Sequence, residues 1–250
     1  AASGRPLWRA WGGTHRVPLT WVLTSQSPAL LVAEAVAVKT RYGFTSIKVK
    51  GGQGLDTDVE AMHELKAALG DGVCLYVDAN GAYPFDNALD YVAAMADAGA
   101  EVVEDPCSLR PDASFTQLQG DTPTPVLVDF GCESLRDAAL FLERGAKAFS
   151  LKPGRFGLTD TREMARLSTD AGCKVVVGMF GESALGTLPA LSLASTLGKD
   201  ALPAEVTWFL AMTKQCITHT ITVENGIATL PDIAGCASLV DWGALSPLPV

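Results

Sequence analysis

An apolar segment followed by an amphipathic stretch recurs along most of the chain, roughly every 25 residues. The apolar segments are rich in Val, Ile, Leu and Phe and do not alternate with polar residues, which is typical of parallel strands buried on both faces. The repeat therefore predicts an α/β fold in which each strand is followed by a helix. The apolar segments are Val17–Leu23, Thr45–Lys50, Val73–Asp78, Glu101–Glu104, Pro125–Asp129, Ala148–Lys152 and Lys174–Gly178.

The stretches between these segments have helical spacing. In residues 56–69, Val59, Met62 and Leu65 fall on one stripe of a helix. A closed barrel of eight strand–helix units takes about 250 residues, and this chain has 250. We therefore predict a TIM-type barrel, (β/α)7β, over residues 17–216. The further helices are expected at Phe85–Ala98, Leu135–Glu143 and Thr159–Ala171.

An open, doubly wound sheet is the structural alternative to a barrel. Such a sheet normally carries a phosphate-binding loop, and the glycine cluster Gly51-Gly52-Gln53-Gly54 does not match G-x-G-x-x-G. The end of the chain differs from both patterns. Thr218–Val223 and Ile227–Leu230, joined by Glu224-Asn225-Gly226, predict a β-hairpin with an Asn-Gly turn. Residues 217–250 are therefore expected to form a C-terminal extension outside the barrel.

Composition limits the partners of this protein. A chain with a net charge of −9 repels phosphate backbones, so we expect no nucleic-acid partner. The apolar runs fall short of the ~20 residues that a membrane span needs, so no membrane partner is expected. The first residues, AASGRPLWRA, lack the pattern of a signal peptide. The six cysteines form no C-x-x-C pair, and we expect reduced thiols in a cytoplasmic protein.

Histidine is too scarce to carry much of the chemistry. The chain has three histidines, which disfavours His-ligated metals and Ser-His-Asp triads. Acid–base chemistry is therefore expected from Lys, Asp or Glu. Charged residues of these types end five consecutive predicted strands, and the carboxyl ends of barrel strands share one rim. These residues are Lys48 and Lys50, then Asp78, Glu104, Asp129 and Lys152.

Three carboxylates on neighbouring strand ends would raise one another's pKa values unless a cation lies among them. Ligation by oxygen alone suits Mg²⁺ or Mn²⁺. Each carboxylate taken singly could instead cap a helix or form a surface ion pair. The occurrence of Asp78, Glu104 and Asp129 in successive units favours a metal site.

The strand period of two places Lys48 and Lys50 on one face of their strand. Neighbouring ammonium groups lower each other's pKa, so we expect one of these lysines to act as a base. A solvated edge strand is the alternative, but the apolar setting SIKVKGG argues against it. Lys152 comes from four strands further round and can address the other side of the metal. A metal between lysines suits removal or addition of a proton α to a carboxylate, through an enediolate.

Several of these segments resemble motifs of the enolase superfamily, in its muconate-lactonizing group. The resemblance covers the chain from about residue 2 to the C-terminus. Five motifs in order are specific for the superfamily, although each one alone is modest. They are SIKVK, LYVDANGAY, VVEDP, PVLVDFGCESLRDA and FSLKPGRFG. The segments GMFGESALGTL, RVPLTWVLTS and PAEVTWFL are similar to further parts of muconate cycloisomerases.

The resemblance implies a role for each matching residue. It implies that Asp78, Glu104 and Asp129, and not Glu133, bind Mg²⁺ or Mn²⁺. It also implies that Lys50 is one acid/base, that Lys48 tunes it, and that Lys152 is the opposing acid/base or a cation that stabilises the enolate. Asn80 would support the ligands. Glu182 and Glu205 match polar positions near the substrate, with a loop cap and a barrel salt bridge as their structural alternatives.

Departures from the family pattern bear on the substrate. Phe130 replaces the Glu that usually follows the third ligand, and Arg155 replaces a second Lys. The Lys-Pro-Gly-Arg segment is closer to o-succinylbenzoate synthases and N-acylamino acid racemases. No Asp-x-Asp occurs on the eighth strand to hold an α-ammonium, which disfavours dipeptide epimerase activity. Cycloisomerisation of a muconate-like diacid is our first expectation. The alternative is o-succinylbenzoate synthase or N-acylamino acid racemase activity.

Family members carry an N-terminal α+β capping domain, and the segment GRPLWRAWGG resembles the end of its last helix. We therefore expect residues 1–16 to be a remnant of that domain, with the cap itself largely missing or separate. The resemblance also implies a homo-oligomer that acts on a small carboxylate. A hypothesis of a different class is a non-catalytic or truncated barrel that binds a metal or a partner without turnover.

Overall fold

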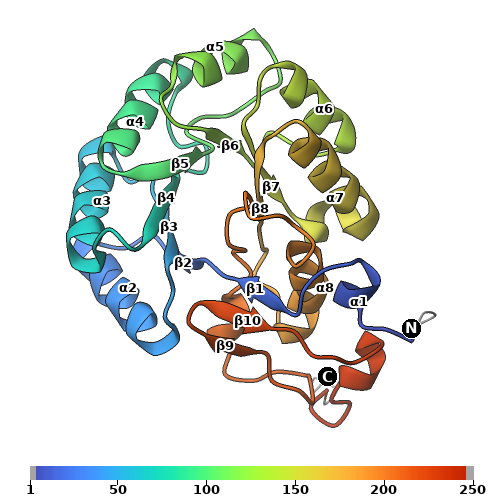
Figure 1. The fold of residues 1–250 in the computed structure, drawn as a ribbon. Helices are drawn as coiled ribbons and strands as arrows, with labels where there is room; N and C mark the ends of the chain where they lie inside the picture. The colour runs from blue at the N-terminus through green and yellow to red at the C-terminus, as the bar shows by residue number, and fades with distance from the viewer. Residues whose placement is uncertain (1–3, 246–250) are drawn as a thin grey trace, which may run out of the picture.

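The computed structural model describes residues 4–245, and its centre is a curled parallel sheet (Figure 1). Within those residues the sheet has seven strands, paired in the order in which they occur along the chain. The strands are β2 (Trp21–Leu23), β3 (Ser46–Lys50), β4 (Cys74–Asp78), β5 (Ala100–Glu104), β6 (Val126–Val128), β7 (Ala148–Leu151) and β8 (Lys174–Val177). Sequential parallel order is the arrangement that the strand–helix repeat predicts.

A helix follows each strand and lies on the outer side of the sheet (Figure 1). Their apolar stripes face the sheet, as the helical spacing predicts. Gly157, with φ 73°, interrupts the helical conformation of α7 after its first turn. The helices are α2 (Pro28–Tyr42), α3 (Leu55–Leu69), α4 (Phe85–Asp97), α5 (Ala113–Asp121), α6 (Leu135–Glu143), α7 (Pro153–Asp170) and α8 (Ala184–Ala194).

Residues 202–205 join the two ends of the curled sheet. On one side, the Leu202 amide donates to the carbonyl of Val175 (2.8 Å), and the Glu205 amide donates to that of Val177 (2.9 Å). On the other side, the Ala204 amide donates to Pro18 O (2.9 Å), and Thr20 N donates back to Ala204 O (2.8 Å). The segment therefore occupies the place of an eighth strand, and the predicted (β/α)7β barrel is confirmed.

Buried side chains form two clusters, one on each face of the sheet. The larger lies between the sheet and the helices. The smaller fills the inside of the barrel and consists of Tyr76, Val102, Leu127, Ala148, Val176 and Leu202. Side chains two residues apart share a face of a strand. The residues two positions after Tyr76, Val102 and Leu127 are Asp78, Glu104 and Asp129, so these carboxylates continue the inner face above its apolar layer.

The predicted C-terminal hairpin is present, as β9 (Thr222–Glu224) and β10 (Ile227–Thr229). It pairs with β1 (Arg16–Pro18) in a separate antiparallel sheet. The predicted single strand Val17–Leu23 is therefore wrong: its first residues belong to this second sheet and its last three to the barrel. Leu19 donates its amide to Gly226 of the hairpin turn at 2.8 Å, so the chain passes from one sheet to the other at Pro18–Thr20.

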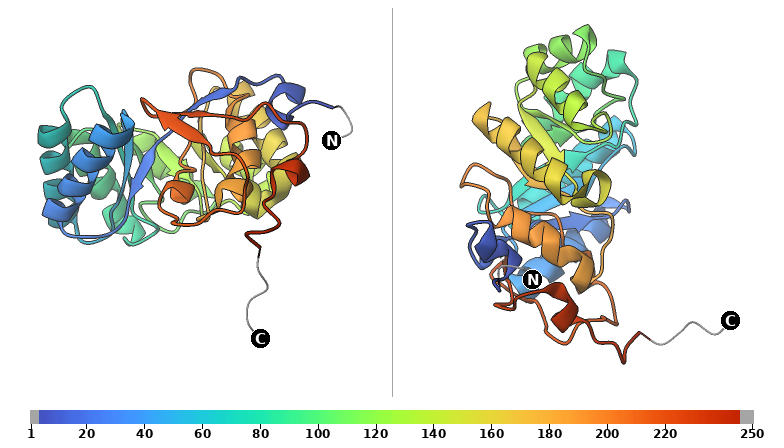
Figure 2. Two further views of the ribbon diagram at one scale, coloured as in Figure 1. Left: turned by 90° about the horizontal axis from the view of Figure 1, so that it is seen from below. Right: turned by 90° about the vertical axis from the view of Figure 1, so that its right-hand side faces the viewer.

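The N-terminal and C-terminal segments lie against the same side of the barrel (Figure 2). The short helix α1 (Leu7–Ala10) contacts the tail, because Trp8 Nε1 donates to Pro231 O at 3.1 Å. Two short 3-10 helices, Trp208–Leu210 and Cys236–Leu239, complete the described elements. None of the helices in the described part of the chain has the length and apolar character to cross a membrane. The boundaries predicted at residues 16 and 216 stay predictions.

Replacing Phe149 with Ala should lower the free energy of unfolding by about 3–5 kcal/mol, because a fully buried ring leaves a cavity when it is removed. Phe149 is 0% exposed and packs edge-on against Phe141, with ring centroids 6.5 Å apart. Urea denaturation would measure the change. Leu30→Ala is the matched control, because Leu30 is 58% exposed and its truncation should cost less than about 0.5 kcal/mol.

Candidate active site at the carboxyl ends of the strands

The structure brings most of the predicted residues together at the carboxyl ends of the barrel strands. Lys50, Asp78 and Glu104 end neighbouring strands and are direct register partners, Lys50 with Asp78 and Asp78 with Glu104. Asp129 directly follows β6, and Lys152 lies between β7 and α7. Strand register therefore sets three of these side chains in one row on the inner face of the sheet.

Lys48 lies at the centre of this group, with its side chain 2% exposed. Its Nζ atom is 2.6 Å from Glu104 Oε2, 2.9 Å from Asp78 Oδ2 and 3.1 Å from Glu205 Oε1. Burial by itself would lower the pKa of this ammonium, but the three carboxylates outweigh burial and hold the pKa well above its ordinary value. The three carboxylates therefore decide the direction of the Lys48 pKa, and the expectation that one of the two lysines acts as a base stays a prediction.

Glu205 and Glu182 differ in what they contact. Glu205 reaches the barrel interior from the segment that closes the sheet, and Tyr76 donates its hydroxyl to Glu205 Oε1 at 2.7 Å. Its ion pair with Lys48 is the barrel salt bridge named as its structural alternative. Glu182 accepts the Phe180 amide at 3.0 Å, within its own loop. This contact within its own loop fits the loop-cap alternative for Glu182.

Asp78 binds both lysines of β3. Lys50 Nζ lies 2.5 Å from Asp78 Oδ2 and donates to Asn80 Oδ1 at 2.9 Å, while the Asn80 amide donates to Asp78 Oδ1 at 2.9 Å. Burial raises the pKa of Asp78, but the positive charges of Lys48 and Lys50 lower it by more. The net pKa therefore lies well below the ordinary value. Asn80 therefore orients both the carboxylate and Lys50, which agrees with a supporting role.

Glu104 lies in the opposite electrostatic situation. Burial and the negative charge of Asp78 raise its pKa well above the ordinary range, against the opposing attraction of Lys48. Its Oε1 atom is buried and accepts no hydrogen bond. An anionic carboxylate with an unpaired buried oxygen is costly, so this position favours a proton or a cation.

Asp129 is held from three directions. Its carboxylate forms an ion pair with Lys152, and Arg155 Nη1 lies 3.1 Å from its Oδ1. Arg155 also donates to the Asp129 carbonyl oxygen at 2.6 Å. Asp105 accepts the backbone amides of Asp129 (3.1 Å) and Phe130 (2.8 Å). Arg155, which departs from the family pattern in the sequence, thus binds Asp129, the predicted third metal ligand, through an ion pair and a hydrogen bond.

Asp105 was not among the predicted site residues. It is buried, and burial raises its pKa to about 7. It lies directly after Glu104 in the segment VVEDP, and its φ of 38° is in the left-handed region. That backbone conformation turns the chain at the strand end, and strand periodicity alone gives no sign of it.

A cavity of about 330 Å³ opens above this cluster. Its charged lining consists of Lys48, Lys50, Lys152 and Glu205, and its apolar walls are Val22, Met179, Phe180 and Trp208. Lys152 Nζ also lies between two aromatic rings, 5.6 Å from the centroid of Phe130 and 5.2 Å from that of Phe180. Such a cavity suits a small anion with an apolar body.

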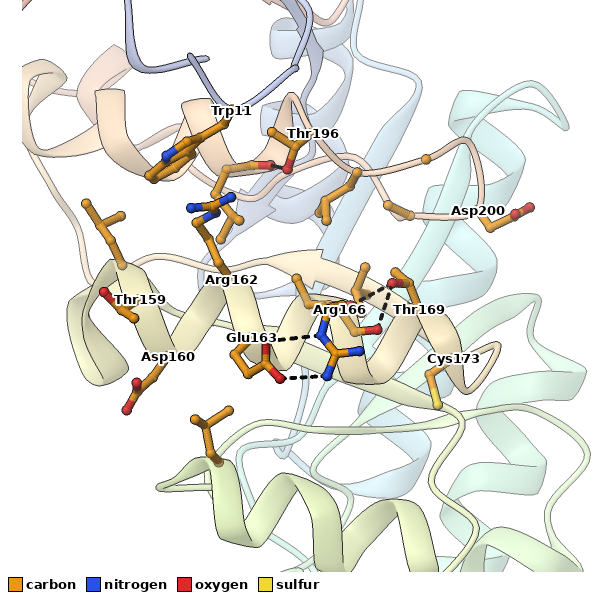
Figure 3. Close-up of a pocket in the computed structure, with 18 of the residues that line it drawn as sticks. Trp11, Thr159, Asp160, Arg162, Glu163, Arg166, Thr169, Cys173, Thr196 and Asp200 are labelled. Atoms are coloured by element: carbon orange, nitrogen blue, oxygen red, sulfur yellow. Dashed lines mark hydrogen bonds and ion pairs between the residues drawn. The ribbon is translucent and has the colours of Figure 1, made fainter. Parts of the chain in front are cut away.

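A larger groove, about 920 Å³, lies outside the barrel along α7 (Figure 3). Among its charged side chains, Arg166 pairs with Glu163 at 2.6 Å and with Asp170, which lies outside the lining, at 2.7 Å. Arg162 lies over the ring of Trp11, 4.5 Å from its centroid. None of the residues at the carboxyl ends of the strands lines this groove, so we place the chemistry in the smaller cavity.

The donor set fits a divalent cation. In residues 4–245, no three His, Cys, Asp or Glu side chains are already gathered as a ligand cluster, because lysines lie among the carboxylates. The predicted ligands nevertheless offer two buried oxygens without a hydrogen bond, Glu104 Oε1 and Asp129 Oδ1, although the second lies 3.1 Å from Arg155 Nη1 in an ion pair. A set of carboxylate oxygens alone suits Mg²⁺ or Mn²⁺. The assignment of Asp78, Glu104 and Asp129 as ligands stays a prediction.

Known proteins resemble this chain in sequence. A family model described as enolase C-terminal domain-like matches residues 30–243. A D-Ala-D/L-Ala epimerase of Cytophaga hutchinsonii is 28% identical over 196 residues, 77% of this chain and 53% of that protein. Muconate cycloisomerase 1-2 of Acinetobacter lwoffii is 27% identical over 250 residues, 98% of this chain and 65% of that protein. The chain therefore spans between half and two thirds of these relatives.

Solved structures resemble it more closely in fold. A muconate lactonizing enzyme from Pseudomonas fluorescens, complexed with muconolactone, superposes with a TM-score of 0.90 at 26% identity, covering 98% of this chain and 67% of that one. A dipeptide epimerase from Cytophaga hutchinsonii, complexed with Mg and D-Ala-L-Val, has a TM-score of 0.85 at 26% identity, covering 94% and 65%.

Lys48→Met should destabilise the metal-free protein by about 3–5 kcal/mol, because it leaves buried carboxylates without their counter-charge. Urea denaturation in EDTA would measure the loss. Lys66→Met is the control: Lys66 lies 3.4 Å from the fully exposed Asp71, and a surface pair contributes about 1 kcal/mol or less. Equal effects of the two substitutions would contradict this account of the cluster.

Gly178→Ala should destabilise the protein by about 1–3 kcal/mol through overpacking. A Cβ atom at Gly178 would lie 2.7 Å from Ser150 Oγ and 2.8 Å from Lys152 Cε. Gly198→Ala is the control, because a Cβ there meets nothing within 4 Å. Thermal unfolding of both variants checks this expectation, and a Gly178→Ala protein as stable as the parent would refute the close approach.

Proposed function

Because the chain belongs to the enolase C-terminal domain-like family, in the mandelate racemase/muconate lactonizing group of the enolase superfamily, we propose that it moves a proton α to a carboxylate in a divalent-metal-dependent reaction. The observation that carries this proposal is a cavity lined by three lysines that pair with the buried carboxylates beneath it. Lys50 and Lys152 come from β3 and from the end of β7, four strands apart, and both line that cavity.

Asp78, Glu104 and Asp129 would hold Mg²⁺ or Mn²⁺ in this proposal. When bound, the metal would hold the substrate carboxylate and stabilise the negative charge of the enediolate. In the structure, Lys48 forms ion pairs with Asp78 and Glu104, and Lys152 forms one with Asp129, so these lysines neutralise part of the negative charge of the carboxylates. Lys48 remains protonated there, and its role is to hold the carboxylates and to keep positive charge beneath the substrate.

Lys50 and Lys152 are the proposed acid–base pair. Lys50 is the more accessible of the two, with 29% of its side chain exposed, and Asp78 and Asn80 orient its ammonium. Lys152 is nearly buried and paired with Asp129. Since the two lysines approach the cavity from different strands, one can add or remove the α-proton while the other stabilises the developing negative charge.

The proposed substrate is a muconate-like diacid, and the proposed reaction is its cycloisomerisation. One carboxylate oxygen adds to the double bond conjugated with the other carboxylate, and the resulting enediolate takes a proton at its α-carbon from a lysine ammonium. The cationic floor suits the carboxylates, and Val22, Met179, Phe180 and Trp208 suit the unsaturated carbon chain. Muconate cycloisomerases among the relatives support the same choice.

A second candidate is o-succinylbenzoate synthase or N-acylamino acid racemase activity. The observation that favours it is the aromatic surface around Lys152, where Phe130 and Phe180 also flank Arg155 at 5.8 and 5.6 Å. Dipeptide epimerisation is less favoured. Glu205, the carboxylate that lines the cavity, is already paired with Lys48, which leaves it poorly placed to bind an α-ammonium. The predicted homo-oligomer, capping domain and cytoplasmic location stay predictions.

Turnover of cis,cis-muconate with MgCl₂ tests this proposal. Lys50→Ala and Lys152→Ala should each lower kcat about 10²–10⁴-fold, because each removes an acid–base group, while the exposed Lys199→Ala leaves it unchanged. Mg²⁺ should raise the Tm of the parent but not that of Asp78→Asn. A parent that Mg²⁺ stabilises but that converts neither muconate nor the succinylbenzoate precursor would favour the non-catalytic barrel over an enzyme.

A further inference from the structure

Asp58 is a buried carboxylate that lies outside the proposed active site. It accepts hydrogen bonds from the loops that follow Lys50 and Asn80. Asp58 lies in the first turn of α3 and is 3% exposed. Its Oδ2 atom accepts hydrogen bonds from the Gly52 amide (2.7 Å), the Tyr83 hydroxyl (2.9 Å) and the Tyr91 hydroxyl (2.9 Å). Its Oδ1 atom accepts the Gln53 amide at 3.2 Å. All four donors thus converge on one side chain.

These donors come from separate parts of the barrel. Gly52 and Gln53 belong to the loop that follows Lys50, whereas Tyr83 lies in the loop that follows Asn80. Tyr91 lies on α4 and stacks on Tyr83, with ring centroids 4.2 Å apart. The Asp58 carboxylate therefore joins the loop after β3 to the loop and helix after β4.

The side chains around this carboxylate pack closely against the backbone of the loop. A Cβ atom on Gly51 would lie 2.6 Å from the Tyr91 hydroxyl and 2.8 Å from Asp58 Oδ2. The Gly51 amide also donates to Asp78 O at 2.9 Å. The residue directly after Lys50 is thus held between β4 on one side and the Asp58–Tyr91 pair on the other.

We infer that Asp58 is a positioning residue, which fixes the loops after β3 and β4 so that the Lys50 ammonium stays between Asp78 and Asn80. Lys50 donates to Asn80 at 2.9 Å. The loops that follow these two residues both donate hydrogen bonds to the Asp58 carboxylate. Asp58 does not line the cavity, so it acts through Lys50 rather than on the substrate. The catalytic part of this inference rests on the proposed role of Lys50 as an acid/base.

A carboxylate is required because both of its oxygens accept hydrogen bonds. In Asp58→Asn, one oxygen becomes an NH₂ group, which donates and cannot accept. The variant keeps the size of the side chain but sets an NH₂ group against at least one donor. That donor is the Gln53 amide if the NH₂ replaces Oδ1, and the Gly52 amide with both tyrosine hydroxyls if it replaces Oδ2. Asp56→Asn is the matched control, because Asp56 lies in the same turn of α3 and is exposed.

Competitive acylation with acetic anhydride tests the position of Lys50 without any need for turnover. Mass spectrometry with peptide fragmentation would report the modification of Lys50 relative to the exposed Lys199. We expect Lys50 to react at least about fivefold faster in Asp58→Asn, because its ammonium leaves the ion pair with Asp78, and at the parent rate in Asp56→Asn. An unchanged Lys50 rate in folded Asp58→Asn overturns the inference.

Muconate turnover provides the second readout. Misplacement of a catalytic group by a distant change can cost about 10²-fold, so we expect kcat to fall about 10- to 100-fold in Asp58→Asn with KM within about threefold. A loss of turnover without faster acylation of Lys50 would overturn the inference. If the parent does not turn over muconate, the proposed function fails while the acylation ratio still decides the role of Asp58.

The tyrosines keep the inference testable if Asp58→Asn does not fold. Tyr83→Phe with Tyr91→Phe removes two of the four donors and keeps both rings. We expect this double variant to raise the rate of Lys50 acylation about twofold or more. Acylation at the parent rate in the folded double variant, together with an unfolded Asp58→Asn, would show that Asp58 supports the fold and not Lys50, and would overturn the inference.

Discussion

The placement of one buried lysine among three carboxylates is the interaction on which the rest of the site depends. Lys48 enters the barrel above its apolar layer and lies within 3.1 Å of Asp78, Glu104 and Glu205. Charges in a dry interior are tolerated only when they compensate one another. The partners come from β4, β5 and the segment that closes the sheet, so the pairing also links the start of the barrel to its end. A divalent cation would add positive charge to a site already built around that balance.

The same requirement explains the small residues and the turns around the cluster. Gly178 leaves room for the Lys152 side chain beside Asp129, and Asp105 holds the backbone of Asp129 through two amides. On the other side, Asp58 holds the loop after Lys50. Each lysine of the proposed acid–base pair is thus supported by a carboxylate that does not line the cavity, Lys50 by Asp58 and Lys152 by Asp105 through Asp129. Preorganised charges of this kind are what proton transfer to a carbon atom requires.

Strand ends were the most predictable part of the protein. Asp78 and Glu104 were expected on one rim, and their strand register confirms that they are neighbours. The assignment of Val17–Leu23 to one strand was wrong, because its first residues pair with β10 and its last three with β3. An apolar run does not show that its two halves pair with different sheets. Asp58 was missed, because its tyrosine partners lie 25 and 33 residues away and a polar residue in an amphipathic helix has no local sign of burial.

The sequence by itself determined which charged residues end which strands, and hence that they would share a rim. Strand period and the strand–helix repeat are local patterns, and a parallel barrel brings all of its carboxyl ends to the same side. Only the tertiary structure decided how those charges pair. Lys48 is the register partner of Tyr76, yet its long side chain reaches Glu205, which lies 157 residues later in the chain. That contact depends on closure of the sheet, which places residues far apart in sequence within hydrogen-bonding distance.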